Sequence, residues 1–172
     1  MAAVGDRVRA RREEIVREHI DAENACDYER ALRTFDHPRY EFVATDEVFE
    51  GPEEVTEHWR ELDRAFPDQK DDLLELHHAD DAVLVEMVSR GTHLGPLRGL
   101  PPTGRRFELP FICIFVFDRD RLVCERVYFD TNTLFAQLGV ASAPDSLRGR
   151  AGTLVNHPLA IARGLVRQLI GR

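Results

Sequence analysis

The chain has 172 residues, of which 43% are hydrophobic and 31% are charged, and its formal net charge is −8. This length favours one domain, and the apolar fraction predicts a folded core rather than disorder. The 31 acidic residues outnumber the 23 basic ones, which argues against nucleic acid as a partner because affinity for phosphates depends on basic groups. Many acids beside a single lysine are also typical of a salt-rich cytoplasm.

The sequence predicts a soluble, cytoplasmic protein. The longest unbroken apolar run covers residues 111–117, far short of the roughly 18 residues that a membrane span requires. The N-terminus does not lead into an apolar signal region. Cys26, Cys113 and Cys124 are an odd number without metal-binding spacing, so we expect free thiols in a reducing compartment.

Three helices are predicted before residue 67. Apolar residues recur at helical spacing between residues 7 and 27, which indicates an amphipathic helix. Asp27 can cap a second, short helix that ends before Pro38. A third apolar stripe follows Pro52 and stops at Pro67, and its members are Val55, Trp59, Leu62 and Phe66.

Strands are predicted after residue 67, where the apolar period changes from about 3.6 to 2. The four candidates cover residues 73–77, 82–93, 106–117 and 122–129, after a brief alternation at 40–45. A polar turn at residues 118–121 predicts a hairpin between the last two strands. Both faces of the strand at 106–117 are largely apolar, so the sheet needs cover on both sides.

We expect the three helices to cover one face of this sheet. The other face must then meet a second copy of the chain, the C-terminal tail, or both. A homodimer through the open face is the expectation.

The C-terminal tail differs in charge from the body. It carries five arginines and one aspartate, hence +4 of the total −8, so the preceding residues carry −12. We therefore divide the chain into a body at 1–143 and a basic tail at 144–172. An amphipathic helix is predicted from Pro158. It can dock on the acidic body or across the dimer, and contact with an anionic membrane is the alternative.

Four motifs, in this order and spacing, resemble the SnoaL-like polyketide cyclases, also called ester cyclases, of the nuclear-transport-factor-2-like superfamily. The resemblance covers roughly residues 8–139. The motifs are Phe66-Pro67-Asp68, Gly91-Thr92-His93-Leu94-Gly95, Gly99-Leu100-Pro101-Pro102-Thr103-Gly104-Arg105 and Glu125-Arg126-Val127-Tyr128-Phe129-Asp130, the last followed by Leu134, Gln137, Leu138 and Gly139.

The resemblance implies an α+β fold in which a cone-shaped, curved antiparallel sheet wraps around the N-terminal helices and leaves an apolar pocket. It also implies an aldol-type ring closure without metal or organic cofactor. An acidic residue at the end of a late strand is the acid/base in the cyclases, and Asp130 occupies the matching position. Superfamily members also include isomerases, epoxide hydrolases, dehydratases and proteins without known activity, so fold alone does not choose the reaction.

The residues themselves leave two interpretations of each catalytic candidate. Alternation places Asp130 on one face with Arg126 and Tyr128, where burial would raise its pKa toward that of a useful base. Alternatively, Asp130 caps a helix beginning near Thr131. His93 lies between two glycines, where it can assist as a proton or oxyanion partner, or it is a loop histidine bonded to nearby backbone.

Further residues are candidates for substrate binding. Asp68 either faces the pocket or stabilises a turn, and His19 either contacts substrate or is a hydrogen-bonded core residue. Aromatic side chains can build the pocket wall or the core: Trp59, Phe66, Phe107, Phe111 and Tyr128. His77 and His78 are neighbours in a strand and point to opposite faces, so we predict no metal site there.

Three hypotheses follow from these observations. The favoured one is a cofactor-free acid/base enzyme, catalysing cyclisation or isomerisation of a small hydrophobic carbonyl compound, with an epoxide hydrolase or dehydratase as a variant on the same fold. The second is a dimeric module that binds a small hydrophobic molecule without turnover. The third is a dimerising scaffold whose tail recruits a surface.

Overall fold

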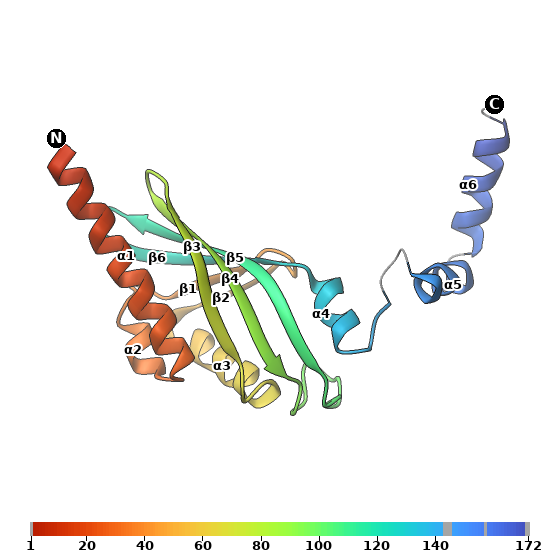
Figure 1. Ribbon diagram of the computed structural model, residues 1–172, viewed down its shortest axis with the longest axis horizontal. Coiled ribbons are helices and arrows are strands. Elements are labelled where there is room, and N and C mark those ends of the chain that lie inside the picture. Colours follow the sequence, from red (N-terminus) through yellow and green to blue (C-terminus); the bar gives the residue numbers. More distant parts are fainter. Residues whose placement is uncertain (1, 143–145, 157, 171–172) are drawn as a thin grey trace.

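The computed structural model describes residues 2–142, 146–156 and 158–170 (Figure 1). The helices are α1 (Ala2–Asn24), α2 (Tyr28–Leu32), α3 (Gly51–Ala65), α4 (Thr131–Gln137), α5 (Leu147–Asn156) and α6 (Pro158–Ile170). The strands are β1 (Arg39–Phe42), β2 (Glu47–Glu50), β3 (Lys70–His78), β4 (Ala82–Thr92), β5 (Arg106–Asp118) and β6 (Arg121–Phe129). No described helix combines the length and apolar character that crossing a membrane needs.

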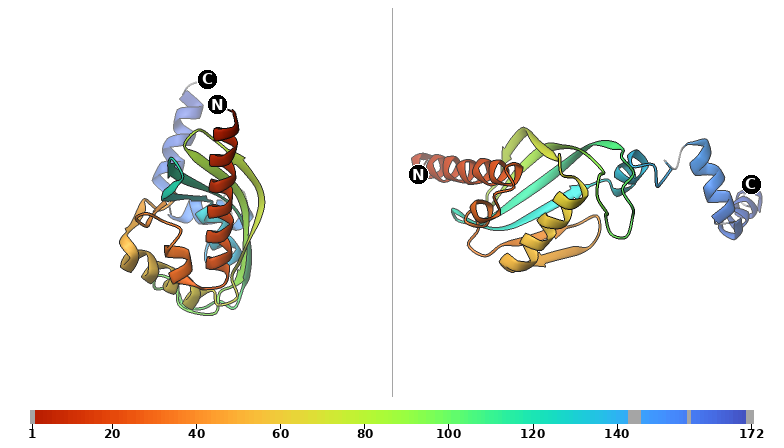
Figure 2. Two further views of the ribbon diagram at one scale, coloured as in Figure 1. Left: turned by 90° about the vertical axis from the view of Figure 1, so that its left-hand side faces the viewer. Right: turned by 90° about the horizontal axis from the view of Figure 1, so that it is seen from below.

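The strands of the body form one curved sheet in the order β2-β1-β6-β5-β4-β3. Neighbouring strands are antiparallel except β1 and β6, which are parallel. The helices α1, α2 and α3 lie on the concave side of the sheet, as the end-on view in Figure 2 shows. The expected α+β architecture of a curved sheet around N-terminal helices is therefore confirmed.

Most predicted elements are present, with two omissions. The strand β2 was expected to be part of a turn, and the helix α5 was not predicted. The cap of α2 is confirmed, because the Asp27 side chain accepts a hydrogen bond from the Arg30 amide at 3.1 Å. The predicted boundary near Pro144 falls outside the described residues.

The core lies between the concave face of the sheet and α1 and α3. On β5, Phe107, Cys113, Phe115 and Phe117 are buried, whereas Ile112 on the opposite face is 43% exposed. Cys113, Phe115 and Phe117 share a core cluster with buried residues of α1 and α3, which include Val16, Ile20, Val55 and Trp59. Phe107 packs in a second cluster with Ala65 and Phe66. Burying each large apolar side chain contributes about 1.5–3 kcal/mol, so the inward face of β5 adds substantially to the stability of the core.

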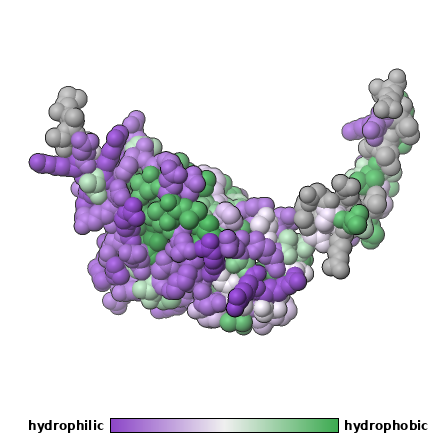
Figure 3. All heavy atoms as spheres, in the orientation of Figure 1, coloured by the Kyte–Doolittle hydropathy of each residue, from purple (hydrophilic) through white to green (hydrophobic). Residues whose placement is uncertain are grey.

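The convex face of the sheet exposes an apolar patch over β3 to β5 (Figure 3). The register places Ile114 between Leu84 and Arg126, and Ile112 between Glu86 and Tyr128. The helices α5 and α6 lie beyond α4, away from the patch (Figure 1). The expected docking of the tail on its own body is thus not seen, and docking across a dimer stays a prediction.

Candidate functional site

An apolar cavity of about 190 Å³ lies between the concave face of the sheet and the helices α1 and α3. Its aromatic wall includes Trp59, Phe66, Phe107 and Phe111. For comparison, an engineered apolar cavity of about 150 Å³ binds benzene. The cavity therefore has room for a ligand of one or two rings. Polar side chains reach its wall in three groups.

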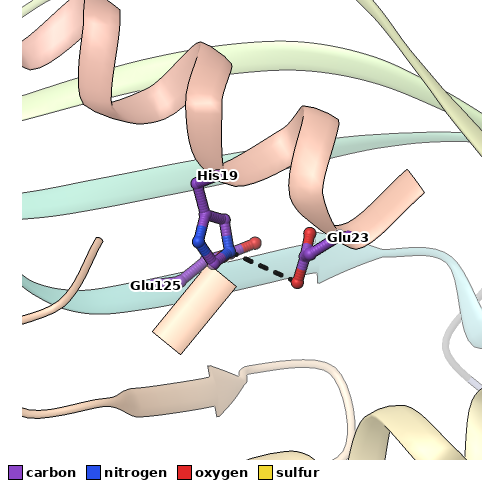
Figure 4. Close-up of side chains that lie close together, drawn as sticks. All are labelled: His19, Glu23 and Glu125. Atoms are coloured by element: carbon purple, nitrogen blue, oxygen red, sulfur yellow. Dashed lines mark ion pairs between the residues drawn. The ribbon is translucent and has the colours of Figure 1, made fainter. Parts of the chain in front are cut away.

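The first group centres on the buried imidazole of His19 in α1 (Figure 4). The Thr34 hydroxyl donates to the Ala31 carbonyl at 2.6 Å, so it accepts from His19 Nδ1–H at 2.7 Å. Nε2 then faces Glu23 Oε1 and Glu125 Oε2, each at 3.3 Å. Burial lowers the pKa of His19, but attraction to both carboxylates outweighs it and raises the pKa to about 10. His19 is therefore an imidazolium at neutral pH.

Tyr40 connects the members of this network. The parallel register of β1 and β6 places Tyr40 beside Glu125. Its hydroxyl lies 2.6 Å from His19 Nε2 and donates to Glu23 Oε1 at 2.6 Å. Burial and the negative charges of Glu125 and Glu23 raise the pKa of Tyr40 well above its usual value. The thiol of Cys113 donates to the other Glu125 oxygen at 3.0 Å. One imidazolium is therefore shared between the side chains of Glu23 and Glu125.

The second group surrounds Asp71 on β3, which is the register partner of Ser89 on β4. Both side chains reach the cavity wall. The Gln69 amide donates to both carboxylate oxygens of Asp71 at 3.3 Å. Burial raises the pKa of Asp71 to about 6, although the Ser89 hydroxyl opposes the shift, and the charge of Glu23 adds to it. Asp71 can therefore both accept and donate a proton near neutral pH.

The end of α1 fixes the position of Asp71. The Asn24 amide donates to the Asp71 carbonyl at 2.8 Å, and the Asp71 amide donates to Asn24 Oδ1 at 2.9 Å. These two bonds fasten β3 to the helix that carries His19. These bonds therefore fix the position of Asp71 relative to the His19 network.

The third group consists of His58 and Trp59 on α3. His58 is 4% exposed and its ring lies between Phe42 and Phe49, with centroid distances of 4.6 and 4.2 Å. Neither ring nitrogen of His58, nor Trp59 Nε1, has a hydrogen-bond partner among the described residues. Such an unpartnered buried group costs about 1–3 kcal/mol. Burial and the charge of Arg98 lower the pKa of His58 to about 4, so its ring is neutral at pH 7.

Two clusters among the described residues have the ligand types for a metal ion. One is His19 with Glu23 and Glu125, which Tyr40 already joins by hydrogen bonds. The other is exposed and consists of Glu75, His77 and Glu86. The prediction that His77 and His78 point to opposite faces is confirmed, because His77 Nε2 faces Glu86 at 3.7 Å whereas His78 Nε2 faces Glu13 on α1 at 3.7 Å.

The expected placement of Asp130 in the pocket is wrong. Asp130 is exposed and forms the N-cap of α4. Its carboxylate accepts hydrogen bonds from the Asn132 amide at 2.9 Å and the Thr133 hydroxyl at 2.6 Å. These bonds lower its pKa, the reverse of what a general base needs. Asp130 is therefore a helix cap, which was the alternative interpretation of this residue.

His93 also lies apart from the cavity wall described above. It is fully buried in the loop after β4, where Nδ1 lies 3.1 Å from the Thr103 hydroxyl and accepts from the Thr103 amide at 3.3 Å. Its ring packs against Phe66 at a centroid distance of 5.4 Å. This geometry is that of a structural loop histidine, and it does not bring His93 to Asp130.

The candidate substrate-binding residues divide into two sets. Trp59, Phe66, Phe107 and Phe111 line the cavity, and His19 forms the buried network at its end. Two other candidates do not reach the cavity. Asp68 is exposed and accepts hydrogen bonds from the Thr92 amide and hydroxyl, both at 2.7 Å. Tyr128 is 40% exposed on the convex face.

Sequence reasoning missed the acidic residues that do line the cavity: Glu23, Asp63, Asp71 and Glu125. A signal for Glu23 was present, because it lies four residues after His19 on the same helix face. Asp71 is two residues before Leu73, which faces Met87 in the core. An acidic residue that shares the alternation of the inward-facing apolar residues is the sequence pattern that predicts such a cavity carboxylate.

Comparison with known proteins supports the fold. The profile of the SnoaL-like polyketide cyclase family matches residues 13–138. The chain belongs to this family. No functionally curated protein matches the sequence.

Several solved structures resemble this SnoaL-like protein. The proposed polyketide cyclase IdmH from Streptomyces antibioticus shares 27% identity at a TM-score of 0.61, covering 75% of this chain and 99% of its own. TsrD from Streptomyces laurentii shares 26% identity at a TM-score of 0.66, covering 77% and 97%. The proposed hydroxylase AclR from Streptomyces galilaeus, at 20% identity and a TM-score of 0.65, covers 76% and 96% and supports the fold alone. The family match and the match to IdmH support a small-molecule-processing protein, and the solved structures as a group support the nuclear-transport-factor-2-like fold.

Proposed function

We propose that this SnoaL-like protein performs acid–base chemistry on a small hydrophobic carbonyl compound, using only its own side chains. The observation that supports this proposal is a carboxyl group, Asp71, on the wall of an otherwise largely apolar cavity. A desolvated carboxyl is a stronger base than one in water, and its pKa of about 6 matches neutral conditions. The description of IdmH as a proposed polyketide cyclase agrees with chemistry of this type.

In the proposed reaction, the Asp71 carboxylate removes a proton from the carbon next to a carbonyl group. The electron pair of the broken C–H bond moves into the carbonyl and forms an enolate. In a cyclisation, the enolate carbon bonds to a second carbonyl carbon, and Asp71 returns its proton to the new alkoxide oxygen. In an isomerisation, Asp71 returns the proton to a different carbon. A positioned acid–base group of this kind contributes about 10²–10⁴-fold to a rate.

The His19 network supports this role of Asp71 indirectly. Burial is the main cause of the raised pKa of Asp71, and the electrostatic effects of Glu23 and Glu125 add to it. The network itself is held by Tyr40 and Thr34. His19 is therefore a positioning residue, and Asp71 is the candidate that touches substrate.

Proton exchange with solvent tests the proposal without knowledge of the natural substrate. The ketone 1-tetralone carries exchangeable protons beside its carbonyl, and NMR in D₂O measures their replacement by deuterium. We expect the wild-type protein to accelerate this exchange, with a rate that rises with pH around 6. We expect Asp71→Asn to lower the rate at least about 100-fold while tetralone still binds. Asp130→Asn is the matched control, and equal rates in wild type and Asp71→Asn would contradict the proposal.

The unpartnered nitrogens on the cavity wall also favour a second candidate function, which is binding without turnover. Native mass spectrometry of the purified protein separates the two. A retained and chemically unchanged ligand, together with no acceleration of tetralone exchange, would favour the binding module.

A further inference from the structure

His58 is a polar side chain whose ring contacts are aromatic. Phe42 and Phe49 contact its ring, which is buried and lines the cavity. A phenylalanine at this position could stack on Phe49 and contact Phe42 without burying two unpartnered nitrogens. The imidazole is therefore best explained by a group that enters the cavity and binds to it.

The chemistry of the ring limits what that group can be. A neutral imidazole has one N–H donor and one acceptor nitrogen. It can bind a neutral oxygen, but it brings no charge to balance an anion. The cavity lining carries four acidic side chains, Glu23, Asp63, Asp71 and Glu125, against one cationic side chain, Lys70, so the wall disfavours an anionic ligand.

We propose that His58 donates a hydrogen bond to the carbonyl oxygen of the substrate and so selects neutral ketones and esters over hydrocarbons and carboxylates of the same shape. This inference deepens the proposed function, and rests on it for the nature of the substrate, but it concerns a different wall of the cavity. His58 lies on α3, whereas Asp71 lies on β3. The oxygen of the substrate would be held at one wall and its acidic carbon at the other.

Three compounds built on the same bicyclic ring system test this selection: 1-tetralone, tetralin and tetralin-1-carboxylate. Binding is followed by NMR titration, with the indole N–H of the single tryptophan, Trp59, as reporter. We expect wild type to bind tetralone roughly tenfold more tightly than tetralin, the usual effect of one hydrogen bond. We expect the carboxylate to bind at least tenfold more weakly than the ketone at pH 7.5.

Variants of His58 separate recognition from packing. His58→Phe keeps an aromatic ring between Phe42 and Phe49, so tetralin affinity should not change, whereas tetralone affinity should fall to that of tetralin. His58→Gln retains an N–H donor and should restore part of the preference. Phe111→Leu is the control, because it alters the apolar wall and should change both affinities by the same factor. In ¹⁵N-histidine-labelled protein, one His58 ring nitrogen should shift with tetralone and not with tetralin.

Equal affinity of wild type for tetralone and tetralin would overturn the inference. So would a preference that survives in His58→Phe, or a failure of both neutral compounds to bind. These outcomes are independent of the proton-exchange test. If tetralone is preferred through His58 but is not deuterated, the inference stands and the proposed catalysis by Asp71 fails. If deuteration depends on Asp71 and His58→Phe has no effect on binding, the proposed catalysis by Asp71 stands and the inference about His58 fails.

Discussion

Asp71 on β3 and Ser89 on β4 are direct partners in an antiparallel register, and both side chains reach the cavity wall. Ser89 is buried, its register partner on β5 is Leu109, and Met87 is its buried neighbour on the same face of β4. The pairing therefore places a carboxyl and a hydroxyl together in a region that excludes most water. Such an arrangement favours proton transfer at the expense of stability.

The cost of burying Asp71 predicts a pH-dependent stability. Its pKa rises from 3.8 to about 6 on folding, so the ionised carboxylate destabilises the fold above pH 6 by up to about 3 kcal/mol. This cost disappears as pH falls through 6 toward 4, because the folded protein takes up the proton first. We expect Asp71→Asn to raise the free energy of unfolding at pH 8 and to raise it much less at pH 4.5. Urea denaturation at both values measures this, and a gain independent of pH would contradict it.

His19 predicts the opposite trend at higher pH. Its pKa is raised from 6.5 to about 10 in the folded protein, so its contribution is complete below pH 6.5 and is lost as pH rises toward 10. Removing one partner of a buried ion pair costs about 3–5 kcal/mol, and we expect His19→Gln to destabilise by that amount at pH 6 and by less at pH 10. The matched control is His77→Gln, an exposed histidine beside two carboxylates. Its effect on the unfolding free energy should stay within about 0.5 kcal/mol.

The cap formed by Asp130 provides a third prediction. Asp130→Ala removes the acceptor for Asn132 and Thr133 at the start of α4, and loss of such a cap costs about 0.5–2 kcal/mol. We expect this loss in thermal or urea unfolding, with tetralone exchange unchanged. A large fall in the rate of tetralone exchange in a folded Asp130→Ala protein would show that Asp130 takes part in catalysis.

The apolar convex face predicts self-association. Ile112 is 43% exposed at the centre of this face, and we propose that two copies of the chain bury it against each other. Light scattering after size exclusion should show a dimer for wild type and a monomer for Ile112→Glu, because an unpaired charge in an apolar interface is costly. Leu94→Glu, an exposed position in the loop after β4, is the control and should leave the mass unchanged. A monomeric wild type would remove the proposal.

The sequence was sufficient to predict the alternation along β6 but not the direction in which its faces point. Arg126 and Tyr128 do share a face, as predicted, but the register pairs Tyr128 with the exposed Ile112 of β5. Directly paired residues lie on the same side of a sheet, so both point outward. Because both faces of β5 are apolar, periodicity could not identify the inner one. Only the pairing and the position of the helices decide it.

The same limit explains the missed cavity carboxylates. Asp71 is the second residue of a strand whose pattern is interrupted by a bulge between Leu73 and Glu75, and the expected strand started two residues after it. Glu125 reaches Tyr40 only through the parallel pairing of β6 with β1. Contacts between segments far apart in the sequence do not leave a local periodic signal. By contrast, α3 was predicted closely because its apolar stripe, Pro52 and Pro67 are all local.

The parallel pairing of β1 with β6 also has a consequence for biosynthesis. Residues 39–42 leave the ribosome long before their partner strand at 121–129. Until that last strand emerges, the nascent chain cannot complete the cavity, and its apolar surfaces are exposed to chaperones or to neighbouring chains. Assembly governed by so distant a contact is expected to be slow, and the pairing of β6 with β1, rather than early helix formation, should set the moment at which ligand can first be held.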